Sequence, residues 1–236
     1  MKAQAKILPD AAQLITAATE HFVATARNAI AKRGVFYVAL AGGSTPKGLY
    51  EKLATEPYRQ QIDWSRVQLF FGDERCVPAD HDDSNYKMAR LAMLDALPIP
   101  AENIHRVPTE AGDATTAAEA YATTLKQVMA DANFDLVLLG LGPDGHIASL
   151  FPETPALTVT DTLTTSVYVE KFDSWRVTLT YPVINAAKQV IVFIAGAAKA
   201  DIVKDITTDA VTGLPVQQLA PQGEYFWFMD QAAAGQ

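Results

Sequence analysis

Short apolar runs alternate along the chain with longer stretches in which apolar residues recur at helical spacing. The runs predict strands at 35–40, 67–71, 104–107, 136–139, 164–170, 176–180, 190–195 and 225–228. The longer stretches predict helices at 10–32, 84–97, 113–130, 182–187 and 197–204, and one that begins at Pro46. Strands that alternate with helices in this way are typical of an α/β protein.

The alternation predicts a doubly wound, mainly parallel sheet in a single domain that spans residues 1–236. Two strands that lie close together in the sequence indicate a small antiparallel excursion at 164–180. Residues 153–162 are expected to form a loop, and the final AAAGQ a frayed tail. Asp10 and Ser84 are the expected helix caps, since both precede apolar-periodic segments.

The composition narrows the possible partners and compartments. The formal net charge is −8, which disfavours a general nucleic-acid or membrane surface and leaves anion binding to a local cluster of positive groups. Cys76 is the only cysteine, so no intrachain disulfide forms and a reducing compartment fits. No window approaches the ~18 apolar residues of a membrane span. We therefore expect a cytoplasmic protein.

Three predicted strands end in polar, glycine-rich turns. In open α/β sheets, ligands bind at the carboxyl ends of the strands, near the point where the strand order reverses. The three turns are therefore expected to meet at one crevice. They read Gly42-Gly43-Ser44-Thr45, Gly72-Asp73-Glu74-Arg75 and Gly142-Pro143-Asp144-Gly145-His146.

The first of these turns suits a phosphate. Its free backbone N–H groups precede a helix that starts at Pro46 with Ser44 or Thr45 as its cap, so the positive end of the helix dipole faces the crevice. The P-loop spacing is missing, and an ordinary capped turn is the alternative interpretation.

The segment GLGPDG at 140–145 matches the GxGxxG pattern of dinucleotide sites. The helix that should follow is cut off by Phe151-Pro152, and the first predicted strand carries GGSTP instead. The acidic residue expected about 20 positions later has no convincing candidate, because Asp161 lies in a loop-like stretch. The match alone is weak, and a dinucleotide is disfavoured.

Charged side chains at the strand ends supply candidate chemistry. An imidazole exchanges protons readily, so His146 suits a general base that activates water, although it could merely hydrogen-bond within its turn. Arg75 can clamp an anion or stabilise an oxyanion, and Asp73 can orient it or hold a hydroxyl; a surface ion pair is the alternative. Arg176 and Lys199 are candidates for the remaining positive charge.

Two other segments are assigned structural roles. Cys76 has no evident base nearby and is expected to be a small, partly buried residue rather than a nucleophile. The run Asp80-His-Asp-Asp83 could bind a metal but is better interpreted as a solvated loop before Ser84.

Four longer motifs, in this order, resemble the 6-phosphogluconolactonase family. They are AGGSTPKGLYEKLA at 41–54, FFGDERCVP with SNY downstream at 70–86, LGLGPDGHIASLFP at 139–152 and RVTLTYPVINAAKQVIVFIAGAAKA at 176–200. The resemblance implies a Rossmann-like sheet and hydrolysis of 6-phospho-D-glucono-1,5-lactone to 6-phospho-D-gluconate in the oxidative pentose phosphate pathway. It implies no obligatory metal or organic cofactor. We also expect a monomer or weak homo-oligomer.

The resemblance also implies roles for single residues. His146 would deprotonate the attacking water, Asp73 would hold the substrate, and Arg75 would bind the anion or the developing oxyanion. The expected substrate- and phosphate-binding residues are Gly42, Gly43, Ser44, Thr45, Gly142, Gly145, Arg176 and Lys199. The chain departs from the family at 171–175, where KFDSW replaces a proline-rich run before Arg176.

Two rival functions stay open. The first is a glucosamine-6-phosphate deaminase or aldose–ketose isomerase of the same superfamily, although the DER and SLFP sequences at 73–75 and 149–152 favour the lactonase over the DEY and FNEP types. The second is a sugar-phosphate-sensing module of a transcriptional regulator. The room before residue 35 and the acidic net charge disfavour that interpretation.

Overall fold

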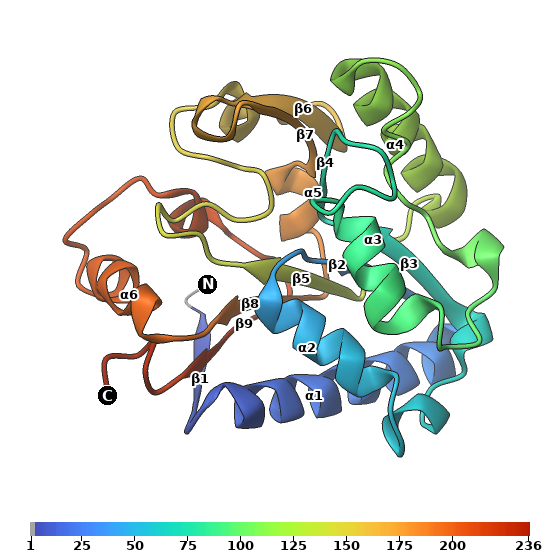
Figure 1. The fold of residues 1–236 in the computed structure, drawn as a ribbon, viewed down its shortest axis with the longest axis horizontal. Coiled ribbons are helices and arrows are strands. Elements are labelled where there is room, and N and C mark those ends of the chain that lie inside the picture. The colour runs from blue at the N-terminus through green and yellow to red at the C-terminus, as the bar shows by residue number, and fades with distance from the viewer. Residues whose placement is uncertain (1–2) are drawn as a thin grey trace.

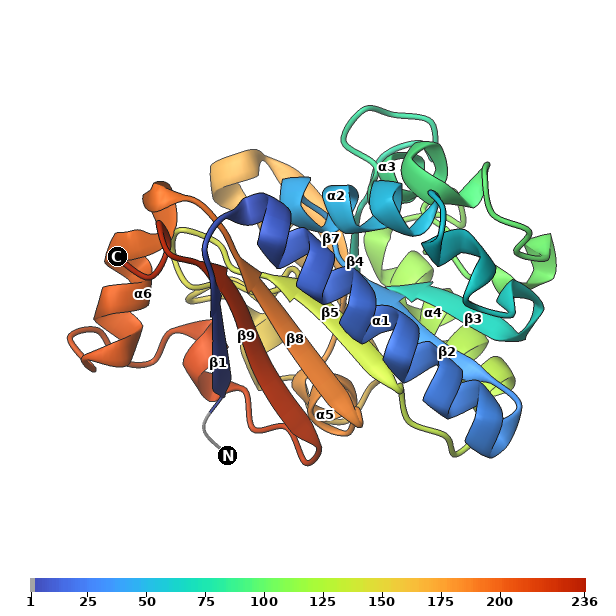
Figure 2. The same ribbon diagram turned by 90° about the horizontal axis from the view of Figure 1, so that it is seen from below.

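A six-stranded sheet forms the centre of the computed structural model, which describes residues 3–236 (Figure 1). The spatial order is β1-β9-β8-β5-β2-β3, and every neighbouring pair is parallel. Figure 2 shows these strands side by side, with α1 crossing them. The strands are β1 (Gln4–Leu8), β2 (Phe36–Leu40), β3 (Val67–Phe71), β5 (Leu136–Gly140), β8 (Gln189–Ile194) and β9 (Glu224–Asp230).

A second, smaller sheet is antiparallel, with the order β4-β7-β6. The predicted antiparallel excursion at 164–180 is confirmed as its β6–β7 hairpin. The third strand, β4, follows Gly72 directly and was expected to be a turn; pairing with β7 draws it into the sheet. The three strands are β4 (Asp73–Arg75), β6 (Thr164–Val169) and β7 (Ser174–Leu179).

Helices cover both faces of the large sheet, which confirms the doubly wound α/β prediction. Buried side chains of α1, α2 and α3 pack in one hydrophobic cluster, and those of α4, α5 and α6 pack in the other. Each central strand supplies alternate residues to the two clusters, as period-2 geometry requires. The helices are α1 (Ala11–Arg33), α2 (Ser44–Leu53), α3 (Asn85–Ala89), α4 (Ala114–Met129), α5 (Tyr181–Asn185) and α6 (Ala200–Thr207).

Two of the three predicted helix caps are confirmed. Asp10 accepts a hydrogen bond from the backbone N–H of Gln13, and Ser84 from that of Lys87. The cap predicted at Ser44 or Thr45 is wrong, because α2 begins at Ser44 and Gly43 is its cap. Gly43 has a φ of +105°, which a side chain rarely tolerates.

Several other boundaries differ from the predictions. The predicted helix at 84–97 is α-helical only to Ala89 and continues as a π-helical turn to Leu94. The predicted strand at 104–107 is reduced to one bridge, between Leu69 and Ile104. The tail is not frayed in this structure, since Ala233 is fully buried within a hydrogen-bonded turn. None of the helices in the described part of the chain is long and apolar enough to span a bilayer.

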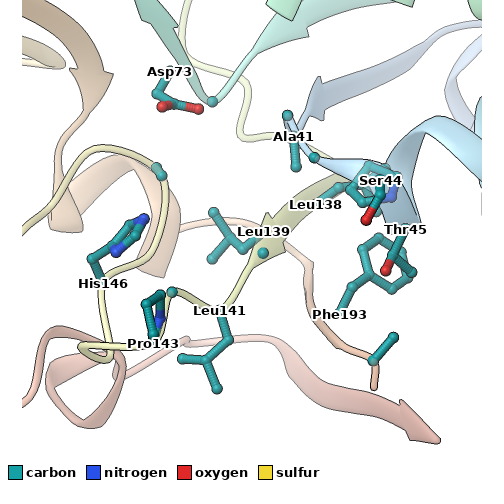
Figure 3. A pocket seen from close by; sticks show the side chains of 18 of the residues that line it. Ala41, Ser44, Thr45, Asp73, Leu138, Leu139, Leu141, Pro143, His146 and Phe193 are labelled. Atoms are coloured by element: carbon teal, nitrogen blue, oxygen red, sulfur yellow. The ribbon is translucent and has the colours of Figure 1, made fainter. Parts of the chain in front are cut away.

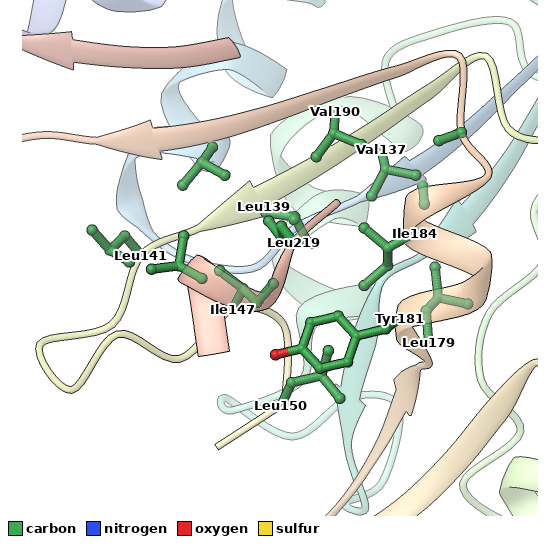
Figure 4. Close-up of a cluster of buried hydrophobic side chains, with 14 of the residues drawn as sticks. Val137, Leu139, Leu141, Ile147, Leu150, Leu179, Tyr181, Ile184, Val190 and Leu219 are labelled. Carbon is green, nitrogen blue, oxygen red and sulfur yellow. The ribbon is translucent and has the colours of Figure 1, made fainter. Parts of the chain in front are cut away.

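A buried cluster anchors the turn that follows β5 (Figure 4). Ile147 and Leu150 are fully buried, and both pack beneath this turn with Leu139 and Leu141. The predicted break in helical structure is confirmed, because a bridge joins Ile147 to Leu150 where a dinucleotide-binding protein would continue as a helix. Residue 146 is thus held between a buried strand end and a buried apolar anchor.

Candidate active site

A cavity of about 290 Å³ opens at the carboxyl ends of β2 and β5 (Figure 3). The chain leaves β2 toward β3 and leaves β5 toward β8, on opposite sides, so this is the switch point of the sheet. Figure 3 shows His146 and Asp73 across the cavity from Ser44 and Thr45. The predicted site residues that line it are Gly42, Gly43, Ser44, Thr45, Asp73, Arg75, Gly142, His146, Arg176 and Lys199.

Two glycines shape the turn that carries the histidine, but only one of them lines the cavity. A Cβ on Gly142 would overlap the imidazole of His146, so the ring lies directly against this backbone. Gly145, the one predicted site residue outside the lining, has a φ of +75° and faces Leu214 instead. Its N–H donates to the carbonyl of Gly142. Gly145 therefore belongs to the support of the turn.

The imidazole of His146 is held by a carboxylate and an aromatic ring. Its Nδ1 lies 2.5 Å from Oδ1 of Asp144, and the ring stacks on Phe151 with centroids 4.0 Å apart. Burial opposes ionisation of Asp144, but hydrogen bonds from His146 and Lys171 outweigh it and hold the pKa of Asp144 well below its usual range. An ionised carboxylate only accepts hydrogen bonds, so Nδ1 carries a proton, and in the neutral imidazole Nε2 then has the lone pair.

The small sheet supplies a buried carboxylate to the cavity. Asp73 accepts a hydrogen bond from the hydroxyl of Ser149 at 2.6 Å and a weaker one from the amide of Asn85 at 3.3 Å. A Cβ on Gly42 would overlap that amide, so the first turn packs directly on Asn85. Glu74 points away and accepts backbone N–H bonds from Arg75, Asn85 and Tyr86. Its carboxylate ties β4 to the start of α3.

Two arginines stand side by side at the same edge. Arg75 on β4 pairs in register with Arg176 on β7, and the Nε of each is buried without a hydrogen-bond partner among the described residues. Burial, and then the charge of Arg75, lower the pKa of Arg176. Within residues 3–236, no carboxylate oxygen lies within 4.0 Å of either guanidinium. Two adjacent cations that lack a carboxylate partner favour an anionic ligand.

Further positive potential comes from the sides of the cavity. Lys199 ends the 3₁₀ turn before α6, and burial lowers its pKa while the charge of Asp144 raises it. Lys199 also has no carboxylate partner within the described residues. The first N–H groups of α2, at Ser44 and Thr45, precede any intrahelical acceptor and carry the positive end of the helix dipole. The cavity is thus cationic in a chain of net charge −8.

Two buried tyrosines fix the strand ends that lead into the site. The hydroxyl of Tyr50 accepts from the N–H of Ala41 at 2.9 Å and donates to the carbonyl of Ala41 at 2.8 Å. Tyr121 makes the same pair of bonds to Phe71, at 2.8 and 2.9 Å. Each hydroxyl thereby satisfies a backbone donor and acceptor at a point where the strand ladder stops.

Removal of the Tyr50 hydroxyl tests this anchoring. Tyr50→Phe leaves a buried N–H and C=O of Ala41 without partners, so the free energy of unfolding is expected to fall by about 1–3 kcal/mol. Tyr58→Phe is the control, because Tyr58 is only half-buried and its hydroxyl bonds to no other described residue. Chemical denaturation measures both variants. Equal stability of Tyr50→Phe and the wild type would contradict the assignment.

Several polar contacts of the site went unnoticed in the sequence. From the sequence, Asp144 is placed only in a glycine-rich turn. An acidic residue two positions before a candidate base is a signal that could have identified it as the partner of His146. Asn85 and Ser149 carry no local signal, because only the fold brings them to Asp73.

Cys76 is half-buried, and burial raises the pKa of its thiol to about 11, which argues against a nucleophile. Residues 3–236 hold no cluster of three or more metal-ligating side chains.

Comparison with known proteins identifies the family. A family model described as glucosamine-6-phosphate isomerases/6-phosphogluconolactonase matches residues 9–227. A 6-phosphogluconolactonase from Synechocystis sp. is 48% identical over 212 residues, covering 87% of this chain and 86% of the relative. One from Nostoc sp. is 42% identical over 243 residues, covering 100% of this chain and 99% of the relative.

A solved structure agrees with these sequence relatives. The 6-phosphogluconolactonase from Trypanosoma cruzi superposes with a TM-score of 0.89 at 31% identity, covering 99% of this chain and 96% of that one. The matched region includes β2, β5 and the turns that line the cavity. The chain therefore belongs to the glucosamine-6-phosphate isomerase/6-phosphogluconolactonase family.

Proposed function

We propose that this protein hydrolyses 6-phospho-D-glucono-1,5-lactone to 6-phospho-D-gluconate, with His146 assisting the attack of water on the lactone carbonyl. The observation that carries the proposal is the pairing, in one cavity, of an Asp144-bound imidazole with three cationic side chains that have no carboxylate partner among residues 3–236. The curated relatives named 6-phosphogluconolactonase support the same substrate.

His146 acts first as a base in the proposed reaction. Its free Nε2 takes a proton from water, and the water oxygen bonds to the lactone carbonyl carbon. The carbonyl oxygen becomes an oxyanion, which Arg75 stabilises. As this intermediate collapses, the bond from carbon to the ring oxygen breaks, and the imidazolium returns its proton to that oxygen. The product is a hydroxy acid, and no covalent enzyme intermediate is needed because a lactone is an activated ester.

The cationic side of the cavity binds the phosphate in this proposal. Arg176 and Lys199 supply charge, and the N–H groups of Ser44 and Thr45 supply a helix N-terminus. Asp73 accepts hydrogen bonds from substrate hydroxyls through the carboxylate lone pairs that its protein partners leave free. Anchoring the distant phosphate orients the lactone carbonyl toward His146, a positioning effect that lowers the barrier.

Parallel assays with two substrates test the proposed function. We expect the purified chain to hydrolyse the phospholactone well above the uncatalysed rate and to release no ammonia from glucosamine 6-phosphate. Ammonia release without lactone hydrolysis would establish the deaminase alternative. A chain that binds sugar phosphates and converts neither would establish a sensing module.

Gly142→Ala tests the close approach of the histidine to its turn. The added Cβ would displace the imidazole, so kcat is expected to fall about tenfold or more because displacement of a catalytic group by an ångström costs that much. Gly140→Ala is the matched control, because a Cβ there meets only the carbonyl of Gly42, at 3.9 Å. If Gly142→Ala and Gly140→Ala lose the same fraction of the wild-type activity, this account is contradicted.

Other expectations from the sequence remain predictions. They are the single domain of residues 1–236, the cytoplasmic location, the monomeric or weakly oligomeric state, and a reaction without a metal or organic cofactor. The small phosphosugar lactone is the partner that the cavity chemistry favours, and the acidic net charge gives no support to a nucleic-acid partner.

A further inference from the structure

A lysine from the small sheet reaches the histidine's partner. Lys171 lies in the turn between β6 and β7, and its Nζ forms an ion pair with Oδ2 of Asp144, 27 positions away in the sequence. The other oxygen of Asp144, Oδ1, is the one that binds His146. A single carboxylate is therefore held between an ammonium and the imidazole.

Aromatic rings surround the same ammonium. The Nζ of Lys171 lies 4.8 Å from the centroid of Phe151 and 5.0 Å from that of Phe172. Phe151 is also the ring on which His146 stacks. Ring faces attract a cation, so they help to hold the ammonium in this place. Lys171 itself does not line the cavity, and contact with a substrate there is not its role.

We propose that Lys171 is a positioning residue for His146: it holds the Asp144 carboxylate against Nδ1 and offsets part of that carboxylate's charge. This inference rests on the proposed function, in which His146 is the base. Removal of the ammonium would leave the imidazole beside the full charge of the carboxylate, which favours the imidazolium.

Other charged groups face His146 as well. Asp144 lies on its own turn and Lys171 on the β6–β7 turn, while Lys199 acts from the turn before α6. Asp73 and Arg75 on β4 and Arg176 on β7 line the same cavity. Lys171 is the one member of this set, among the described residues, that forms an ion pair with Asp144 besides the histidine. Its removal is thus expected to have a distinct effect.

Titration of the histidine signals by NMR tests the inference without any substrate. Lys171→Met keeps an apolar stem among the rings and removes the charge, while Lys171→Arg keeps the charge. We expect the midpoint of His146 to rise by about half to one pH unit in Lys171→Met and to return toward wild type in Lys171→Arg. The midpoint of His81, which is exposed and outside the cavity, should not move. An unchanged His146 midpoint in Lys171→Met overturns the inference.

Kinetics give a second readout. In Lys171→Met the acid limb of kcat is expected to move by the same amount, so kcat falls about threefold to tenfold on that limb and recovers at alkaline pH. KM should stay within about twofold, because Lys171 lies outside the cavity lining. A loss that is equal at all pH values, or confined to KM, overturns the inference. A wild-type chain without lactonase activity overturns the proposed function instead, and the NMR titration then decides the Lys171–His146 coupling by itself.

Discussion

His146→Ala is expected to lower kcat/KM for the phospholactone by about 10²–10⁴-fold, the usual contribution of a positioned general base. Among the cavity-lining groups of the described chain, only this imidazole is oriented by Asp144 through one ring nitrogen and keeps the other available as a base. Its removal leaves the cationic binding groups in place, so the loss should fall on kcat more than on KM. Initial rates across a range of substrate concentrations separate the two constants.

The control for this variant is another histidine. His81→Ala removes an exposed imidazole that does not line the cavity, and its activity should equal that of the wild type. Thermal unfolding of both variants checks that the fold is kept, because Ile147 and Leu150 anchor the turn independently of the imidazole. Turnover of a folded His146→Ala protein at nearly the wild-type rate would remove the histidine from the mechanism.

Arg176→Met is expected to lower kcat/KM for the phosphorylated lactone by about 10²-fold, because truncating one partner of a buried, charge-assisted contact costs a few kcal/mol. Arg176 is buried, its Nε lacks a protein partner, and it stands beside Arg75. An anion that binds here relieves the repulsion between the two guanidinium groups. The kcat/KM of this variant for the unphosphorylated lactone should be close to that of the wild type. The ratio of the kcat/KM values for the two substrates measures the difference.

A matched arginine separates phosphate binding from general effects of charge. Arg90 also has a buried Nε without a hydrogen-bond partner, but it does not line the cavity. Arg90→Met should therefore leave the ratio of kcat/KM for the phosphorylated lactone to kcat/KM for the unphosphorylated lactone unchanged. If Arg176→Met lowers the rates for both lactones equally, the phosphate is not bound by Arg176.

Parts of the fold with strong local signals were predictable from the sequence. The apolar run of β3 gave its boundaries at Val67–Phe71, and the Asp10 and Ser84 caps gave two helix starts. The edge strand Gln4–Leu8 was missed because most of it is exposed and it lacks an apolar run. Strand β4 was read as a turn because three charged residues form a strand only when β7 pairs with them.

The site was predictable to the extent that strand ends of a parallel sheet must meet. That rule placed His146, Asp73 and the Gly42–Thr45 turn together, and the structure brings them to one cavity. It could not give the contacts of Asp144 with Lys171, because their approach depends on the path of the β6–β7 hairpin. Gly145 is expected from the sequence to bind the substrate, but it does not line the cavity, and its φ of +75° serves the turn instead.

The most direct test of the central claim is the rate of acid release from freshly prepared 6-phospho-D-glucono-1,5-lactone at constant pH, with wild-type and His146→Ala protein measured in parallel. We predict a wild-type rate proportional to enzyme concentration and well above the spontaneous hydrolysis of the lactone, with His146→Ala close to that spontaneous rate. A wild-type rate equal to the spontaneous one, or equal rates for the two proteins, would contradict the account.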